Sequence, residues 1–135
     1  MSVEKGDCVL ITESISGCAG VHGGKYNGFQ AFGISGANFY APFDPNTSLP
    51  GSANAYSNTP SVAVSTSNSN DMIISIAQQS SYGTLSAGSG FTILIPGIAY
   101  SEYKTSNSPV SNLQVTFGDT ATWYWEQITD ALKQA

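Results

Sequence analysis

Arginine is absent from this 135-residue chain, and the other ionisable residues are few. The chain has four lysines, nine acidic residues and one histidine, so that charged residues make up 10% of the sequence. Ordinary soluble domains contain about 25% charged residues. With so few cations and a formal net charge of −5, the chain has no basic surface for a polyanion, and we expect no nucleic acid partner.

Long apolar runs are also lacking, which bears on the membrane. No stretch of 18 consecutive apolar residues occurs, so we expect no membrane insertion. No signal peptide is recognisable at the start of the sequence either. Because the other features below favour export, we expect that a leader has been removed from this chain.

Cysteine is represented only by Cys8 and Cys18. A disulfide between them would close an 11-residue ring and stabilise the fold by about 2–3 kcal/mol if its effect is on chain entropy. The alternative is two buried free thiols in a cytosolic protein, whereas a metal site is disfavoured because two cysteines and His22 fall short of a tetrahedral set. We predict the disulfide, and with it an extracellular, cell-surface or virion-surface location.

Small polar residues and glycine dominate what is present. Ser, Thr, Asn and Gly occupy 54 positions, while 41% of the residues are hydrophobic. That apolar fraction is sufficient for one core but would leave two domains short of buried area. The composition predicts a single folded domain, residues 1–135, with a surface of hydroxyls and amides.

Period-two alternation is the main structural signal, and turn residues separate the alternating runs. It predicts strands at residues 8–14, 28–34, 61–66, 72–78, 91–95, 98–104 and 112–117. Val62 and Val64 alternate with Ser61, Ala63 and Ser65, which is typical of a strand with one wetted face. The run 71–77 is more continuously apolar and predicts a central strand covered on both sides. We expect residues 67–70 to form the hairpin turn between these two strands.

Two segments are less regular. Residues 120–134 fit either a helix or a strand, and the paired tryptophans in a β-rich context favour a strand from 122 to about 129. Residues 35–60 show no clear period and predict one long irregular loop, which we expect Phe39, Tyr40 and Phe43 to pin to the core. The predicted fold class is all-β: an antiparallel, jelly-roll-like β-sandwich with one long loop and little or no helix.

Several short motifs in the second half follow one another in a familiar order. They are found at residues 70–76, 90–92, 101–104, 122–123, 128 and 131–132. In that order they resemble the jelly-roll, concanavalin-like sandwich domains of large secreted surface and fibre proteins of prokaryotes and their viruses. The resemblance covers residues 61–132 and implies an adhesive, spacer or assembly module without a reaction. Nothing in residues 1–60 matches it, so a strand supplied by a neighbouring chain is conceivable, and an exposed sheet edge would then pair with other chains.

Catalytic machinery is hard to assemble from these residues. His22 lies in a glycine-flanked loop. A catalytic histidine needs a nucleophile beside it and an acid behind it, and the sequence places neither next to His22. A glycosidase needs two facing carboxylates, for which the candidates are Glu13, Asp44, Asp71, Glu102 and Glu126. We expect Glu102 and Glu126 to face solvent or to pair with Lys104, and Asp71 to close a hairpin. We therefore assign no catalytic residue and no cofactor.

Calcium is the one metal with candidate ligands in the sequence. Asn38, Asp44 and Asn46 offer hard oxygen atoms on the predicted long loop. Asp and Asn are also the commonest turn formers, which is the more frequent role of such residues. We expect no metal at these positions.

Aromatic side chains are the remaining functional lead. Most strand tyrosines pack with their hydroxyls at the rim, but an exposed ring can bind a sugar face or a partner protein. The candidate ligand or interface residues are Tyr26, Tyr40, Tyr56, Tyr82, Trp123 and Trp125. The leading hypothesis is a non-enzymatic structural, assembly or adhesion module that associates with itself or with neighbouring surface proteins. A carbohydrate-binding module is the alternative, and a glycoside hydrolase is the second alternative.

Overall fold

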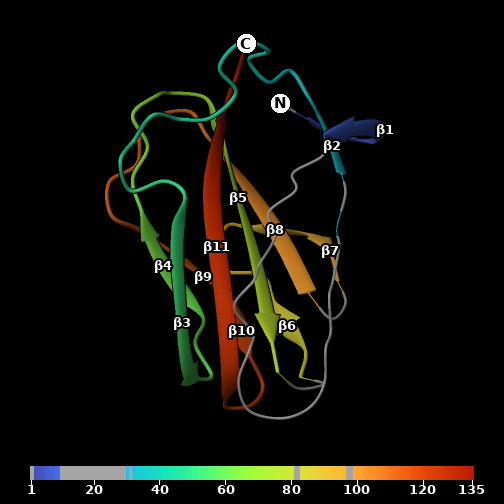
Figure 1. Ribbon diagram of the computed structural model, residues 1–135, viewed down its shortest axis with the longest axis vertical. Helices are drawn as coiled ribbons and strands as arrows, with labels where there is room; N and C mark the ends of the chain where they lie inside the picture. Colours follow the sequence, from blue (N-terminus) through green and yellow to red (C-terminus); the bar gives the residue numbers. More distant parts are fainter. Residues whose placement is uncertain (1, 10–29, 31, 81–82, 97–98) are drawn as a thin grey trace.

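The computed structural model describes residues 2–9, 30, 32–80, 83–96 and 99–135 (Figure 1). All regular structure in these residues is β-strand, and every strand pair is antiparallel. The predicted all-β, sandwich-like fold is therefore confirmed.

One five-stranded sheet forms the larger layer of the molecule. Its spatial order is β3-β11-β5-β8-β7, so that β3 and β7 are its two edges. The strands are β3 (Gly51–Ser57), β11 (Trp123–Lys133), β5 (Asp71–Gln79), β8 (Ala99–Ser106) and β7 (Thr92–Ile95).

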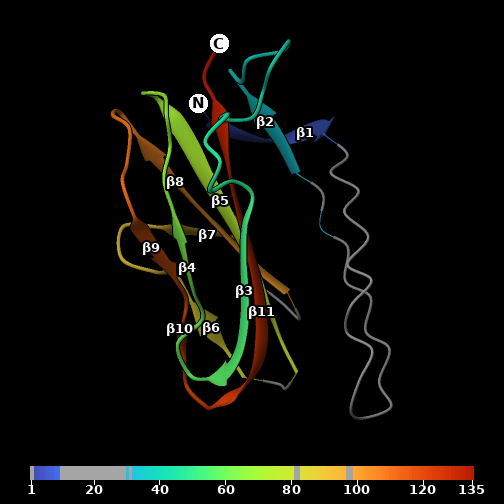
Figure 2. The ribbon, with the colours of Figure 1, turned by 60° about the vertical axis from the view of Figure 1, so that its left-hand side comes forward.

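Two small strand pairs form the second layer, which faces the inner side of that sheet (Figure 2). They are β4 (Ser61–Val64) with β9 (Leu113–Thr116), and β6 (Leu85–Ser86) with β10 (Gly118–Asp119). A further pair, β1 (Ser2–Val9) with β2 (Phe32–Ser35), lies on the opposite side of the five-stranded sheet.

The core lies between the two layers. Val62, Val64 and Val115 of the smaller layer pack with Ile73 and Ala131 of the larger one, and all five are buried. A second buried cluster consists of Ala77, Leu85, Tyr100 and Phe117. Fully burying an aliphatic side chain of this size contributes about 1.5–3 kcal/mol. Along β4 the valines are buried and Ala63 is exposed, which confirms the alternation predicted from the sequence.

Strand β5 is covered on both faces, as its apolar run predicts. Ile73 and Ala77 point into the core, whereas Met72 and Ile74 join Leu132 in an outer cluster. Ile34 of β2 packs against this outer cluster. The C-terminal strand β11 lies next to β5, which settles the choice between helix and strand in favour of a strand that continues to Lys133.

Three details differ from the sequence-based expectations. Residues 51–57, expected to be irregular, form β3, which has no β-branched residue to signal it. Residues 67–70 are not a hairpin turn, because β4 pairs with β9 while β5 pairs with β11 and β8. They cross from one layer to the other, and local turn residues do not distinguish a crossover from a hairpin. At the N-terminus β1 begins at Ser2, earlier than the predicted strand 8–14, of which residues 8–9 are strand and residues 10–14 lie outside the described part.

Candidate functional site

Edge strand β3 is the most unusual surface element. It pairs with β11 through seven consecutive residue pairs, from Ser57↔Trp123 to Gly51↔Thr129, without a shift in register. Within the described ranges, β11 is the only strand that pairs with β3. Its outer row of backbone N–H and C=O groups is thus a template for another strand.

The sequence around β3 contains almost no charged residues. Between Lys25 and Asp71 the sequence contains one charged residue, Asp44, and that side chain is buried. Natural edge strands usually carry a lysine, an internal proline or a bulge that prevents pairing with other chains. None of these occurs within β3, although Pro50 directly precedes it.

Contacts at both ends of β3 hold the strand against the sandwich. A Cβ added at Gly51 would lie 2.9 Å from the Cγ1 atoms of Val62 and Val64, so the backbone here approaches β4 as closely as glycine permits. At the other end the Trp125 indole N–H donates a hydrogen bond of 2.8 Å to the Ser57 hydroxyl. Strand β3 is therefore a regular edge strand that is held in place at both ends.

Aromatic side chains gather at one end of this edge. Tyr56 of β3 and Tyr124 of β11 are opposite each other in register, with ring centroids 4.9 Å apart and an interplanar angle of 57°. Their side chains are 58% and 67% exposed, and neighbouring Trp123 is 38% exposed. Trp125, a predicted interface residue, is only 5% exposed, because it points into the sandwich, and it is not available to a partner.

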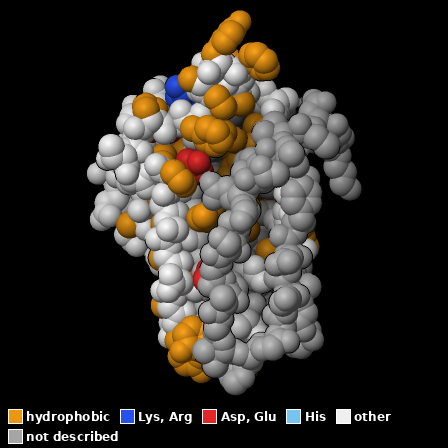
Figure 3. Space-filling view, in the orientation of Figure 1, with side chains coloured by type: hydrophobic (Ala, Val, Ile, Leu, Met, Phe, Trp, Pro, Cys, Tyr) orange, Lys and Arg blue, Asp and Glu red, His pale blue; other side chains and the backbone are white. Residues whose placement is uncertain are grey.

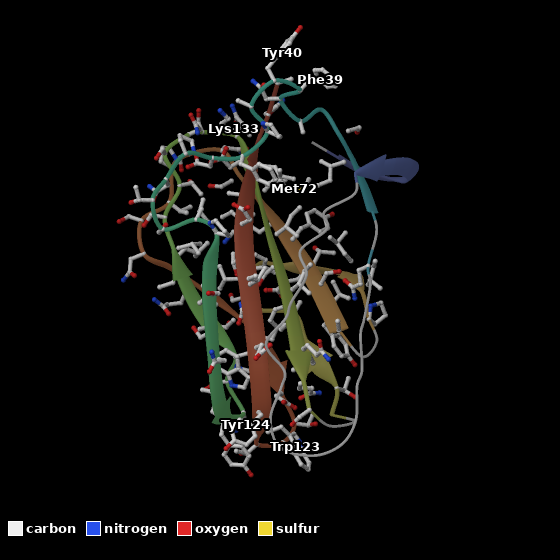
Figure 4. All side chains as sticks on the ribbon, viewed as in Figure 1. Phe39, Tyr40, Met72, Trp123, Tyr124 and Lys133 are labelled. Carbon is white, nitrogen blue, oxygen red and sulfur yellow. The ribbon has the colours of Figure 1, made fainter. Side chains whose placement is uncertain are left out.

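Phe39 and Tyr40 lie at the opposite end of the molecule from Trp123 and Tyr124 (Figure 4). They are 90% and 94% exposed and contact each other edge-to-face. The expectation that they pin the loop to the core is wrong. The Asn38 side-chain oxygen accepts the backbone N–H groups of Tyr40 and Ala41, which forms a turn that carries both rings outward. Hydrophobic side chains are accordingly visible at both ends of the surface in Figure 3.

Several predicted residues fall outside the described part of the chain. These are Tyr26, Tyr82, His22, Glu13 and Cys18. Cys8 belongs to β1, but its side chain is not described. The Cys8–Cys18 disulfide therefore remains a prediction.

The calcium candidates have their oxygen atoms occupied by N–H donors. The Asp44 carboxylate accepts the backbone N–H groups of Asn46, Ser67 and Asn68 and the Asn68 side-chain amide, at 2.6–3.1 Å. Asn46 accepts the N–H of Ser48, and Asn38 caps the turn described above. Such donors present partial positive charge toward the site, which suits an anion and not a cation. No group of three potential metal-ligating acids, histidines or cysteines occurs among the described residues.

Asp71 is fully buried beside Asp44 and does not close a hairpin. Burial, together with the charge of the neighbouring Asp44 carboxylate, raises the pKa of Asp71 to about 6, while the Thr66 hydroxyl and Lys133 act in the opposite direction. Among the described residues, no group has the distance and angle of a hydrogen bond to either Asp71 oxygen, so nothing offsets the burial of this carboxyl by direct bonding. Burial alone would raise the pKa of Asp44, but the surrounding N–H groups hold it below its usual value. Of the two carboxyls, Asp71 is therefore the one that takes up a proton first as the pH falls.

Glu102, expected to face solvent, is completely buried in the sandwich. It lies on β8 opposite Ser75, whose hydroxyl is 2.8 Å from that of Thr129 and accepts the Gln127 amide at 2.9 Å. Burial raises the pKa of Glu102 to about 7, against the effect of a hydrogen bond from the Gly88 N–H. Because Asp71 and Glu102 are both inaccessible, neither can meet a polysaccharide as a glycosidase would require.

The residues described contain no helix that is long and apolar enough to cross a membrane.

Comparisons with protein-family models, with curated proteins and with solved structures found no match.

Proposed function

We propose that this chain is a non-enzymatic assembly or adhesion module of an extracellular surface or filament protein, and that it associates with other chains through β3. The observation that carries the proposal is the seven-residue, regular and uncharged edge. Addition of a strand to an open edge is a common mode of recognition, in which the main chain supplies the hydrogen bonds. The jelly-roll resemblance and the predicted disulfide are compatible with this role.

The expected affinity is modest. Each backbone hydrogen bond contributes about 0.5–1.5 kcal/mol net, while association costs at least about 4 kcal/mol of translational and rotational freedom. A strand of this length therefore supports weak association that becomes effective at the high local concentration of a fibre or layer.

Sedimentation velocity from low micromolar to millimolar concentration tests the proposal. The protein should form oligomers as its concentration rises. Asn54→Lys places a charge in the middle of β3 and should weaken association by at least about tenfold. Thr92→Lys, at an exposed position of the other edge strand β7, is the matched control and should leave association unchanged. A protein that stays monomeric throughout, or an equal effect of the two lysines, contradicts the proposal.

A carbohydrate-binding role is the second candidate, favoured by the exposed rings of Tyr56, Tyr124 and Trp123. The 57° tilt between the two tyrosines means that they do not form one flat platform, so this role ranks below assembly. Titration with a panel of oligosaccharides, followed by tyrosine and tryptophan fluorescence, tests it. Saturable binding that is lost in Tyr124→Ala, with self-association retained, would establish the carbohydrate role.

A further inference from the structure

The side chains of β3 are all able to meet a copy of themselves. The strand contains only Gly, Ser, Ala, Asn and Tyr. A hydroxyl or an amide carries both a hydrogen-bond donor and an acceptor, so it can bond to an identical group, whereas a carboxylate or an ammonium group repels its own copy. This composition suits an isologous contact, in which the same patch is used by both partners.

The sizes of the side chains on the outer face of β3 would also be complementary between two copies of the strand. Ser52, Asn54 and Tyr56 share this face, because their register partners on β11 are Ile128, Glu126 and Tyr124. If two copies of β3 run antiparallel with Asn54 at the centre, the small Ser52 of each copy lies opposite the large Tyr56 of the other. Both tyrosines would then have room beside a short side chain.

The net charge of −5 does not oppose this contact. The charged residue opposite the centre of β3 is Glu126 on β11, one strand inward from the edge. In a joined sheet Glu126 and its copy would be three strand spacings apart, about 14 Å. That distance exceeds the Debye length of about 8 Å at physiological ionic strength. In the second layer the adjacent strand β4 is uncharged as well.

We propose that the partner of β3 is β3 of a second copy of this chain, aligned antiparallel about a two-fold axis at Asn54. The two five-stranded sheets join at this axis into one continuous sheet. This inference rests on the proposed assembly function and names the partner and the register. Backbone groups of both edges become paired, and the exposed Tyr56 rings become part of the interface.

Cysteine cross-linking tests the register. Opposed residues of an antiparallel pair have Cα atoms about 4.5–5.5 Å apart, within the range that a disulfide spans. Asn54→Cys should therefore form a disulfide-linked dimer under mild oxidation. Ser52→Cys and Tyr56→Cys should each cross-link poorly alone but should cross-link to each other when the two variants are mixed. Peptide mass spectrometry identifies the linked residues, and the parent protein controls for Cys8 and Cys18.

Hydrogen exchange gives a second measurement that needs no substitution. Amide protection in residues 51–57 should increase with protein concentration, while protection in residues 92–95 should not. This measurement keeps the test valid if a cysteine variant folds poorly.

The outcomes separate the two proposals. Linkage at position 54 and concentration-dependent protection of β3 support the inference. Oligomers that form without linkage at position 54 and without protection of β3 overturn the inference and the use of β3 in the proposed function, and leave only an assembly role through another surface. Oligomers that protect β3 but link a different pair of residues overturn the register at Asn54. A protein that is monomeric at every concentration overturns both.

Discussion

The two edges of the five-stranded sheet are built differently. At β3 seven residue pairs continue without a break, whereas β7 forms only three pairs with β8 and its register shifts between Ile93 and Ile95. An irregular register bends an edge strand and disrupts the row of groups that another strand would bind. Thr92–Ile95 is the more hydrophobic of the two strands, yet its backbone is the less suitable template. Regularity and lack of charge, more than hydrophobicity, therefore make an edge strand suitable for pairing.

The interior beneath the two edges differs as well. Glu102, opposite Ile93, places a buried carboxyl directly beside β7. Beneath β3 the interior-facing neighbours on β11 are Trp125, Gln127 and Thr129, none of which titrates near neutral pH. Changes of pH should therefore loosen the β7 side and leave the β3 side unchanged.

The largest expected effect comes from removing the support of β3. Trp125→Ala deletes a buried indole and its hydrogen bond to Ser57, and should lower the free energy of unfolding by about 3–5 kcal/mol. Denaturant unfolding measures the loss, and hydrogen exchange should show β3 losing more protection than β7. Trp123→Ala is the control, because that side chain is partly exposed and its removal should cost much less. Equal losses in the two variants would mean that Trp125 does not hold the edge.

The next effect belongs to Glu102 on the β7 side. Its pKa is raised from 4.5 to about 7 in the folded protein, so between these values the native state binds more protons than the unfolded state. The contribution of Glu102 to the free energy of unfolding is therefore fully present below about pH 4.5. It is lost as the pH rises toward 7, by an amount on the order of 3 kcal/mol. Glu102→Gln should raise the melting temperature at pH 8 and flatten its pH dependence.

Hydrogen exchange at pH 5 and pH 8 assigns this effect to one side of the sheet. Residues 92–95 should lose protection at the higher pH, whereas residues 51–57 should not. A melting temperature that rises from pH 5 to pH 8 would show that Glu102 is not held in the core as described.

A smaller pair of effects, opposite in sign, is expected from the two buried aspartates. At neutral pH Asp71→Asn removes a charge that burial and Asp44 disfavour, and should stabilise the fold by about 1 kcal/mol. Asp44→Asn weakens bonds to several N–H donors and should destabilise it by about 1–2 kcal/mol. Thermal melts from pH 4 to pH 8 compare the two variants, and the same sign for both would contradict the raised pKa of Asp71 and the lowered pKa of Asp44.

The smallest effect concerns the Tyr56–Tyr124 ring pair. Tyr56→Ala should lower stability by about 0.5–1 kcal/mol, because an exposed cross-strand aromatic contact contributes little. Its effect on self-association should be several-fold larger than that of Tyr40→Ala at the far end of the molecule. Sedimentation equilibrium of the two variants makes that comparison, and the reverse order would move the interface away from β3.

Sequence periodicity predicted some strands well and missed others for a definite reason. Val62 and Val64 on β4, and the apolar run of β5, bury enough area to leave a clear signal. Strand β3 contributes only Gly51, Ala53, Ala55 and Ser57 to the inner face, so its alternation cannot be detected from hydrophobicity. Of the predicted interface candidates, Tyr40, Tyr56 and Trp123 are exposed and Trp125 is buried, and their role at an interface stays a prediction.

Residue type and order are sufficient to predict the all-β class, the burial of β5 on both faces and the absence of charge between Lys25 and Asp71 apart from Asp44. The identity of neighbouring strands, the edge position of β3 and the burial of Asp71 and Glu102 depend on the folded arrangement. Alternation specifies which face of a strand is covered. It does not specify what covers that face or what lies beside the strand, because both depend on segments distant in the chain.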